Sequence, residues 1–422
     1  MIFSLTLLLF LLRISARPST SPHSPSILNS PQTIIDGFPI GRTQLSQDDM
    51  IELGKLAIAV NSAYCPKSYK LQPHPSASKE YEGSPSRKNH RMHKTKSKFA
   101  QHDDGSSIVI SSDDDEFRRE QTYHGDMKWY ISHTPSTQTL TLALSSLSST
   151  DDLLELRASS PSPSPSGSTS TDSEILVPLP ASLFPYPFGY LHPSSSKGKE
   201  PKIHHAYIPF LKTHGKSALL SLLDLIEDPP ATTTTSSHSD VLKEYITSLG
   251  SPSSVMTNKP IRKIKIVGHG LGSAIGLLVT LALSMELSNG HHLSSSSSRS
   301  QDHLHDLEIS TTLFGLPRVG NIHFARLVDS LIDSRGSSLK MNRITSYGDT
   351  ITHLPERHLN LTHPSKNEIW IGPDPRIAYF CKPSPYQDGM ESNLCAAGIK
   401  LEKTSLIDHL GPYADVWMDK KC

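Results

Sequence analysis

Residues 261–287 read IRKIKIVGHGLGSAIGLLVTLALSMEL. The first seven residues alternate between apolar and polar side chains, which predicts a β-strand at Ile261–Val267. The stretch Ser273–Leu287 is apolar on nearly every helical face, which predicts a buried helix rather than a surface helix. Between them, the glycine-rich sequence GHGLG at 268–272 predicts a tight turn. A strand, a tight turn and a buried helix in this order are typical of an α/β fold.

The rest of the chain continues this alternation of strands and helices. Helices are predicted at Asp48–Tyr64, Ser217–Glu227, Asp240–Leu249 and Asn321–Ile332, and strands at Trp129–Ser132, Thr139–Leu144, Ile309–Phe314, Arg343–Ser346 and Glu368–Ile371. Asp48 or Asp49 is expected to cap the first helix. Helices of ten or more residues between strands predict a largely parallel sheet with helices on both faces. The two strands from 129 to 144 are expected to form a hairpin.

The composition indicates long polar inserts within one domain. Only 36% of the 422 residues are hydrophobic, and 32 are proline. Ser/Pro-rich or highly charged stretches bury too little apolar surface to fold by themselves. A Ser/Pro-rich segment is predicted at 17–45, a single domain at 46–422, and disordered inserts at about 66–126, 158–173, 193–201, 229–239 and 290–302. Equal numbers of acidic and basic residues, 41 of each, argue against a globally basic nucleic-acid binder.

The first sixteen residues predict export from the cell. Ile2–Leu12 is almost continuously apolar, too short to span a bilayer, and a small-residue cleavage site follows at Ala16. In a secreted, extracellular protein the four cysteines are expected to form two disulfides, for which three pairings exist. Their positions favour Cys381–Cys395 and Cys65–Cys422. Asn360 begins an Asn-Leu-Thr sequon and is a candidate glycosylation site.

Two motifs compete for the glycine turn. A dinucleotide-binding G-x-G-x-x-G/A turn is disfavoured, because Ser273 occupies the third small position and no acidic strand end follows the helix. The nucleophile elbow G-x-S-x-G matches at every position except the reactive one, where Gly270 replaces the serine. Glycine adopts the strained positive-φ backbone of an elbow without steric cost, so the fold is expected to tolerate this residue.

Five segments together resemble the fungal class 3 lipases, which are secreted α/β-hydrolases that cleave triacylglycerols and related esters. They are NSAYC at 61–65, VGHGLGSA at 267–274, FGLPRVGN at 314–321, RITSYGDTITHLP at 343–355 and DHL at 408–410 followed by Tyr413. The resemblance extends over about Asp48–Cys422 apart from the inserts. It implies an α/β-hydrolase fold and a lipid or ester ligand in an apolar cleft. It also implies contact with a lipid interface and the Cys65–Cys422 disulfide.

The resemblance also assigns the site residues. Gly270 lies at the nucleophile position between Gly268, His269 and Gly272, while Asp349 and His409 match the acid and the base. In such a site the histidine takes the hydroxyl proton and the aspartate orients the imidazole. The family's R-G-S/T oxyanion element aligns with Ser145-Ser146-Leu147, which puts Leu147, without a hydroxyl, beside the backbone N–H of Leu271. The family's H-x-G-F segment is represented only by HAYI at 205–208.

These departures predict a secreted lipase-like protein that is catalytically impaired, a pseudoenzyme of lipid metabolism, because Gly270 has no oxygen. Two alternatives remain open. One is an active carboxylic-ester hydrolase with a displaced nucleophile, or with a water activated by His409 and Asp349. The other is a non-enzymatic protein that binds an acyl ligand or a partner. Ser273 is expected to point away from His409, and LPASLFPYPFGY at 179–190 to cover the cleft. No cofactor, metal site or nucleic acid is expected, and the chain is expected to be a monomer.

Overall fold

The computed structural model describes residues 34–35, 38–39, 42–65, 106–112, 127–147, 175–184, 200–230, 259–289, 307–333, 339–383 and 391–418. The chain divides into two compact units, Met1–Ile40 and Gly41–Cys422. In the first unit, β1 (Ile34–Ile35) and β2 (Phe38–Pro39) form an antiparallel pair. The second unit contains every other element described below. The predicted signal peptide at 1–16 lies outside the described residues.

A mixed sheet forms the centre of the second unit. Its strands are β3 (Arg42–Gln44), β4 (Ser107–Ser111), β5 (Trp129–Thr134), β6 (Thr139–Leu144), β9 (Lys263–His269), β10 (Glu308–Phe314), β11 (Leu339–Ser346), β12 (Glu368–Ile371) and β13 (Ala378–Cys381). Among the described residues their order is β3-β13-β12-β11-β10-β9-β6-β5-β4. The pairs from β6 through β12 are parallel, and the outer pairs at both edges are antiparallel. This confirms the predicted largely parallel sheet.

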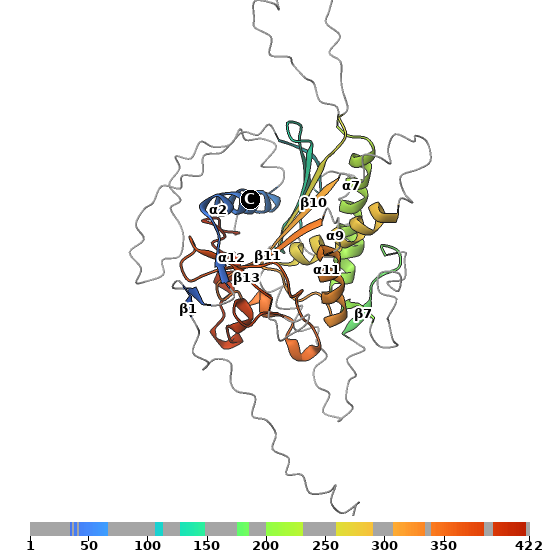
Figure 1. Cartoon of the computed structure of the whole chain (residues 1–422). Coiled ribbons are helices and arrows are strands. Elements are labelled where there is room, and N and C mark those ends of the chain that lie inside the picture. Colours follow the sequence, from blue (N-terminus) through green and yellow to red (C-terminus); the bar gives the residue numbers. More distant parts are fainter. Residues whose placement is uncertain are drawn as a thin grey trace, which may run out of the picture. The chain divides into compact units, whose positions relative to one another are not determined.

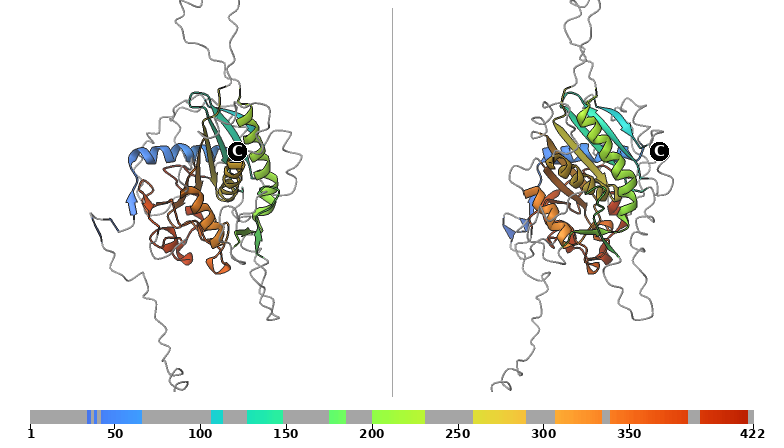
Figure 2. Two further views of the ribbon diagram at one scale, coloured as in Figure 1. Left: turned by 45° about the vertical axis from the view of Figure 1, so that its right-hand side comes forward. Right: turned by 90° about the vertical axis from the view of Figure 1, so that its right-hand side faces the viewer.

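Helices cover both faces of this sheet (Figure 1). The longer ones are α2 (Gln47–Ala63), α7 (Lys216–Glu227), α9 (Leu271–Asn289) and α11 (Ile322–Asp333). Shorter elements are the strand pair β7 (Leu176–Pro178) and β8 (Lys202–His204), the helices α6 (Tyr207–Phe210) and α12 (Leu406–Leu410), and single turns at Leu211–Gly215, Ile351–His353, Arg357–Leu359, Ala396–Gly398 and Leu401–Lys403. Figure 2 shows α2 on one side of the sheet and α7 and α9 on the other.

Each strand contributes side chains to both faces of the sheet, because neighbouring side chains on a strand point in opposite directions. Val267 packs in the cluster that contains the buried residues of α2, whereas Ile264 and Ile266 pack with α7 and α9. On β6, Ala143 and Leu142 divide between the two clusters in the same way. Strands that are apolar on both faces are characteristic of a parallel sheet covered by helices on each side.

Helix α9 is the central core helix. Among the described helices, it is the one long and apolar enough to cross a membrane, with a mean hydropathy of 1.6 over Leu271–Ser288. Yet 83% of that stretch is buried inside the protein. The helix is apolar because it is buried against β9 and β10. The absence of a polar helical face in its sequence predicted this burial.

The structure corrects several local predictions. The cap of α2 is Ser46, not Asp48 or Asp49: the Ser46 hydroxyl accepts from the Asp49 N–H, and the Asp49 carboxylate accepts from the Ser46 N–H. In the insert predicted at 66–126, Ser107–Ser111 form strand β4 and pair with β5. The predicted helix Asp240–Leu249 lies outside the described residues.

Candidate active site

The turn between β9 and α9 has the geometry of a nucleophile elbow. β9 ends at His269, α9 begins at Leu271, and Gly270 between them has φ +53°. The Gly270 N–H donates to the Phe314 carbonyl at 2.9 Å, which ties the turn to the end of β10. A Cβ atom at Gly272 would collide with the carbonyl oxygens of Leu144 and Ser145. The turn therefore needs glycine at 270 for its backbone conformation and at 272 for its close approach to β6.

Asp349 and His409, the predicted acid and base, lie within hydrogen-bonding distance of each other. Asp349 lies in the loop after β11, and His409 lies in α12. His409 Nδ1 is 3.0 Å from Asp349 Oδ2 and 3.1 Å from Oδ1, and both side chains are buried. The Ile351 N–H donates to Asp349 Oδ1 at 2.8 Å, and the Tyr413 hydroxyl lies 3.4 Å from Oδ2. The carboxylate therefore holds Nδ1 as the protonated ring nitrogen and leaves Nε2 as the acceptor.

The acceptor nitrogen of this histidine faces the elbow. A Cβ atom built on Gly270 would lie 2.9 Å from His409 Nε2. His409 Nε2 is buried and has no hydrogen-bond partner among the described residues. The elbow, the base and the acid are thus brought together in the arrangement that a serine hydrolase uses, with a glycine where its oxygen would be attached.

A hydroxyl from the segment that follows β6 occupies part of that space. The same Cβ on Gly270 would lie 2.5 Å from Ser146 Oγ and 3.0 Å from Ser146 Cβ. The Leu271 N–H, at the start of α9, donates to Ser146 Oγ at 3.3 Å. The sequence assigned Leu147 and Leu271 to the oxyanion region but did not reveal this contact of Ser146. The signal in the sequence was the serine at the glycine position of the family's R-G-S/T element.

Two further side chains, Tyr64 and His269, connect the residues after β6 to His409. The Ser146 N–H donates to the Tyr64 hydroxyl at 3.2 Å, and that hydroxyl lies 2.6 Å from His269 Nδ1. His269 Nε2 lies 2.8 Å from the His409 carbonyl, and the two rings stack with centroids 4.3 Å apart. Burial, and to a lesser extent the neighbouring His409, hold the pKa of His269 well below its usual range. A neutral His269 therefore donates from Nε2 and accepts from Tyr64 at Nδ1.

Several apolar residues that the sequence assigned to the site or its cover are buried in one core cluster. Leu147 and Leu271 are buried in the cluster that also contains Leu183 and Phe184, from the segment predicted to cover the cleft. The rest of that segment, residues 185–190, lies outside the described residues. Ser273 points away, since its hydroxyl donates to the Phe314 carbonyl at 2.7 Å. Ser273 is therefore not available to His409.

The remaining predicted residues lie away from this centre. Cys381 and Cys395 form a disulfide. Cys65 is disulfide-bonded as well, while its predicted partner Cys422 lies outside the described residues. Asn360 is exposed, at the end of the turn Arg357–Leu359. Its glycosylation stays a prediction.

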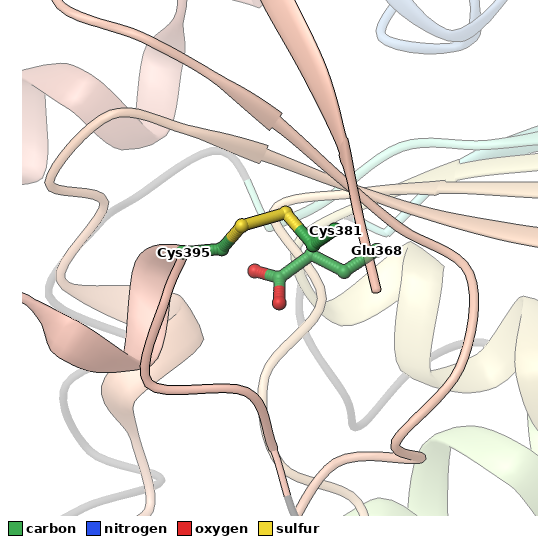
Figure 3. Close-up of side chains that lie close together, drawn as sticks. All are labelled: Glu368, Cys381 and Cys395. Carbon is green, nitrogen blue, oxygen red and sulfur yellow. A yellow bond between two sulfur atoms is a disulfide. The ribbon is translucent and has the colours of Figure 1, made fainter. Parts of the chain in front are cut away.

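Among the described residues, one grouping resembles a metal site by proximity, namely Glu368, Cys381 and Cys395. Figure 3 shows the Glu368 carboxylate beside the sulfurs of the Cys381–Cys395 disulfide. Disulfide sulfurs are not thiolates, and the thiolate is the form of cysteine that binds metal. Glu368 instead contacts Arg343, with Oε2 3.3 Å from Nη2. This grouping is a structural feature of the β12–β13 edge.

The sheet, its covering helices and the elbow have the architecture of the α/β-hydrolase fold. The lipase of Rhizomucor miehei in its propeptide complex superposes with a TM-score of 0.50 at 17% identity, covering 96% of each chain. The Lip2 lipase of Yarrowia lipolytica also has a TM-score of 0.50, at 16% identity, covering 90% of this chain and 97% of the other. At these identities the structures establish the fold alone.

Part of the sequence is also similar to a family of lipases. Residues 189–359 match the family model of lipase (class 3). A secreted mono- and diacylglycerol lipase of Malassezia globosa is 30% identical over 151 residues, which are 36% of this chain and 40% of the relative. A lipase of Rhizopus niveus is 27% identical over 161 residues, 38% of this chain and 34% of the relative. The chain thus spans less than half the length of these relatives, and the matched region supports the class 3 lipase family.

Proposed function

We propose that this chain is a secreted lipase-like protein that binds an acyl ester, and that its hydrolysis of esters through the elbow position is impaired. The observation behind this proposal is that Gly270 faces the unpartnered Nε2 of His409 without offering an oxygen. An acyl-enzyme needs an oxygen that is both close to the base and able to attack the ester carbonyl. In subtilisin, loss of the nucleophile alone reduces kcat about a millionfold.

The proposed ligand class follows from the relatives and from the surroundings of the elbow. Several relatives are named as secreted mono- and diacylglycerol lipases, and Leu147 and Leu271 are buried in the apolar core here. An apolar site with few polar groups suits an acyl chain whose ester group lies at the polar centre. Glycerol esters at a lipid interface, bound by a monomeric extracellular protein, are therefore the proposed ligands.

A reciprocal exchange of two residues tests this proposal. The variant Gly270→Ser/Ser146→Gly attaches a hydroxyl to the elbow and removes the side chain that would collide with it. We expect this variant to hydrolyse a short-chain p-nitrophenyl ester at least about 100-fold faster than the parent, because the nucleophile is the largest missing contribution. Adding the substitution His409→Ala to this variant should abolish the gain in hydrolysis rate.

Equal rates for the folded exchange variant and its parent would contradict the proposal. Urea unfolding of both proteins shows whether the variant is folded. Turnover by the parent at the rates of ordinary lipases would contradict it as well, because the elbow position would then not limit the reaction.

A further inference from the structure

We propose that the Ser146 hydroxyl is the nucleophile of this site, supplied by the end of β6 in place of the side chain missing at residue 270. This inference rests on the proposed function, because it concerns the ester-cleaving step of the same site. It starts from the finding that Ser146 Oγ and His409 Nε2 both lie within 3 Å of one point, the Cβ position of a side chain at Gly270. Serine and glycine have in effect exchanged places between the elbow and the neighbouring loop.

Hydrogen bonding around Ser146 agrees with this role. Ser146 Oγ accepts from the Leu271 N–H, which is the kind of contact that stabilises negative charge on an attacking oxygen. His409 Nε2, in contrast, is a buried acceptor without a partner among the described residues. The proposed role requires the Ser146 hydroxyl to turn towards that nitrogen, and catalytic hydrogen bonds commonly shorten only when substrate is bound.

The reaction then balances without any further reagent. As Ser146 Oγ attacks the ester carbonyl carbon, its proton passes to His409 Nε2, and Asp349 stabilises the resulting imidazolium through Nδ1. The C–O bond to the alcohol breaks, and the alcohol leaves with the proton from Nε2. Water then attacks the acyl-Ser146 ester, gives a proton to Nε2, and releases the carboxylic acid as Ser146 regains its hydrogen.

The stabilisation of the tetrahedral intermediate differs from that of an ordinary elbow. The Leu271 N–H, at one of the two positions that the family resemblance assigns to the oxyanion region, now contacts Ser146 Oγ. Leu147 has no side-chain hydroxyl to add. Loss of one donor of this type costs about 100- to 1,000-fold in rate. Slow turnover through Ser146 is therefore consistent with an impaired lipase.

Covalent labelling locates the nucleophile directly. The purified full-length chain is treated with a fluorophosphonate probe, and the modified residue is identified by peptide mass spectrometry. We expect the label on Ser146, its loss to the level of heat-denatured protein in Ser146→Ala, and its retention in Ser273→Ala. Ser273 is the matched control because it is equally buried, in the adjacent helix, and its hydroxyl donates to Phe314.

The exchange variant Gly270→Ser/Ser146→Gly separates the two proposals. If the parent is unlabelled, or labelled equally in Ser146→Ala, while the exchange variant gains a label at position 270, the assignment of Ser146 is wrong and the proposed function stands. If the folded exchange variant gains neither a label nor turnover, the proposed function fails. A parent label on a serine other than Ser146 also overturns this inference.

Discussion

The Tyr64 hydroxyl lies 2.6 Å from Nδ1 of His269, and this contact joins the end of α2 to the elbow. Through it, the Ser146 N–H and the His409 carbonyl are connected by one series of hydrogen bonds. Tyr64 and the neutral His269 thus help to position Ser146 and His409 without taking up a proton themselves. Such supporting contacts determine how precisely a catalytic group is held.

The first prediction concerns the removal of the Tyr64 hydroxyl. In Tyr64→Phe the Ser146 N–H and His269 Nδ1 lose a partner within the buried site, so the free energy of unfolding should fall by about 1–3 kcal/mol. Labelling of Ser146 should also slow. Tyr130→Phe is the matched control, since its buried hydroxyl donates to the Ala59 carbonyl at 2.9 Å, outside this network. Urea unfolding and labelling rates measure both effects; equal labelling rates in the two variants would contradict a positioning role.

The single substitution Gly270→Ser should destabilise the protein rather than repair it. The new Cβ atom would lie 2.5 Å from Ser146 Oγ, in a residue with φ +53°. Overpacking costs about 1–3 kcal/mol, and a non-glycine residue in this backbone region costs a similar amount. We expect the free energy of unfolding to fall by about 2–4 kcal/mol, and Ser146→Gly in the same chain to recover the overpacking part. Chemical denaturation checks this; no recovery in the double variant would show that the two side chains do not collide.

A buried ion cluster should maintain the loop that contains the acid. Glu391 contacts Arg318 at 2.6 Å and Arg357 at 2.8 Å, and its side chain is 1% exposed. Arg318 also donates to the carbonyls of His353 and Pro355, which follow Asp349 in the chain. Glu391→Gln leaves the buried Arg318 without its counter-ion, and should lower the free energy of unfolding by about 3–5 kcal/mol.

Arg357→Gln is the control for this cluster. The Arg357 side chain is 43% exposed, and exposed ion pairs contribute about 0–1 kcal/mol. Equal losses for Glu391→Gln and Arg357→Gln in urea unfolding would show that the buried pair with Arg318 has no special role.

Acid should destabilise the protein through buried histidines. Burial, together with His205, lowers the pKa of His204 to about 4. The unfolded chain takes up the proton near pH 6.5, so this contribution to stability is intact above that pH and is lost as the pH falls towards 4. His204→Asn keeps an acceptor for the Ala206 N–H that now donates to Nδ1. It should reduce the loss of unfolding free energy between pH 7.5 and 5 by about 1–2 kcal/mol.

The partly exposed neighbour supplies the comparison for that experiment. His205→Asn removes only the smaller cause of the lowered pKa of His204, so it should change the pH dependence of urea unfolding less than His204→Asn does. If His204→Asn and His205→Asn have the same slope as the parent, His204 does not contribute to acid sensitivity.

The sequence predicted most of the sheet because its signals are local. Ile261–Val267 alternates, Ser273–Leu287 is apolar all round, and the glycines between them allow only a sharp turn, so β9, α9 and the elbow could be inferred without coordinates. Strand β4 was missed because it is short and lies within a charged stretch. Its pairing with β5, not its own composition, determines its conformation.

The site residues also differ in whether the sequence alone could identify them. Asp349 and His409 were assigned through the resemblance to a family, and the structure brings them together beside Gly270. The contact between Ser146 and residue 270 joins the ends of two strands, β6 and β9, far apart in the chain, so no periodicity reveals it. Each motif by itself indicated a lost serine at Gly270 and a lost oxyanion hydroxyl at Leu147, whereas the structure places the hydroxyl of a third residue, Ser146, beside Gly270.

The burial of α9 has a consequence for how the protein denatures. Its stretch Leu271–Ser288 is shielded only while the sheet and α7 surround it. On heating, eighteen consecutive residues with the hydrophobicity of a bilayer span become available to other chains at the same moment. Thermal inactivation should then be irreversible and should depend on the heating rate and on protein concentration, and a mild detergent should slow the resulting precipitation.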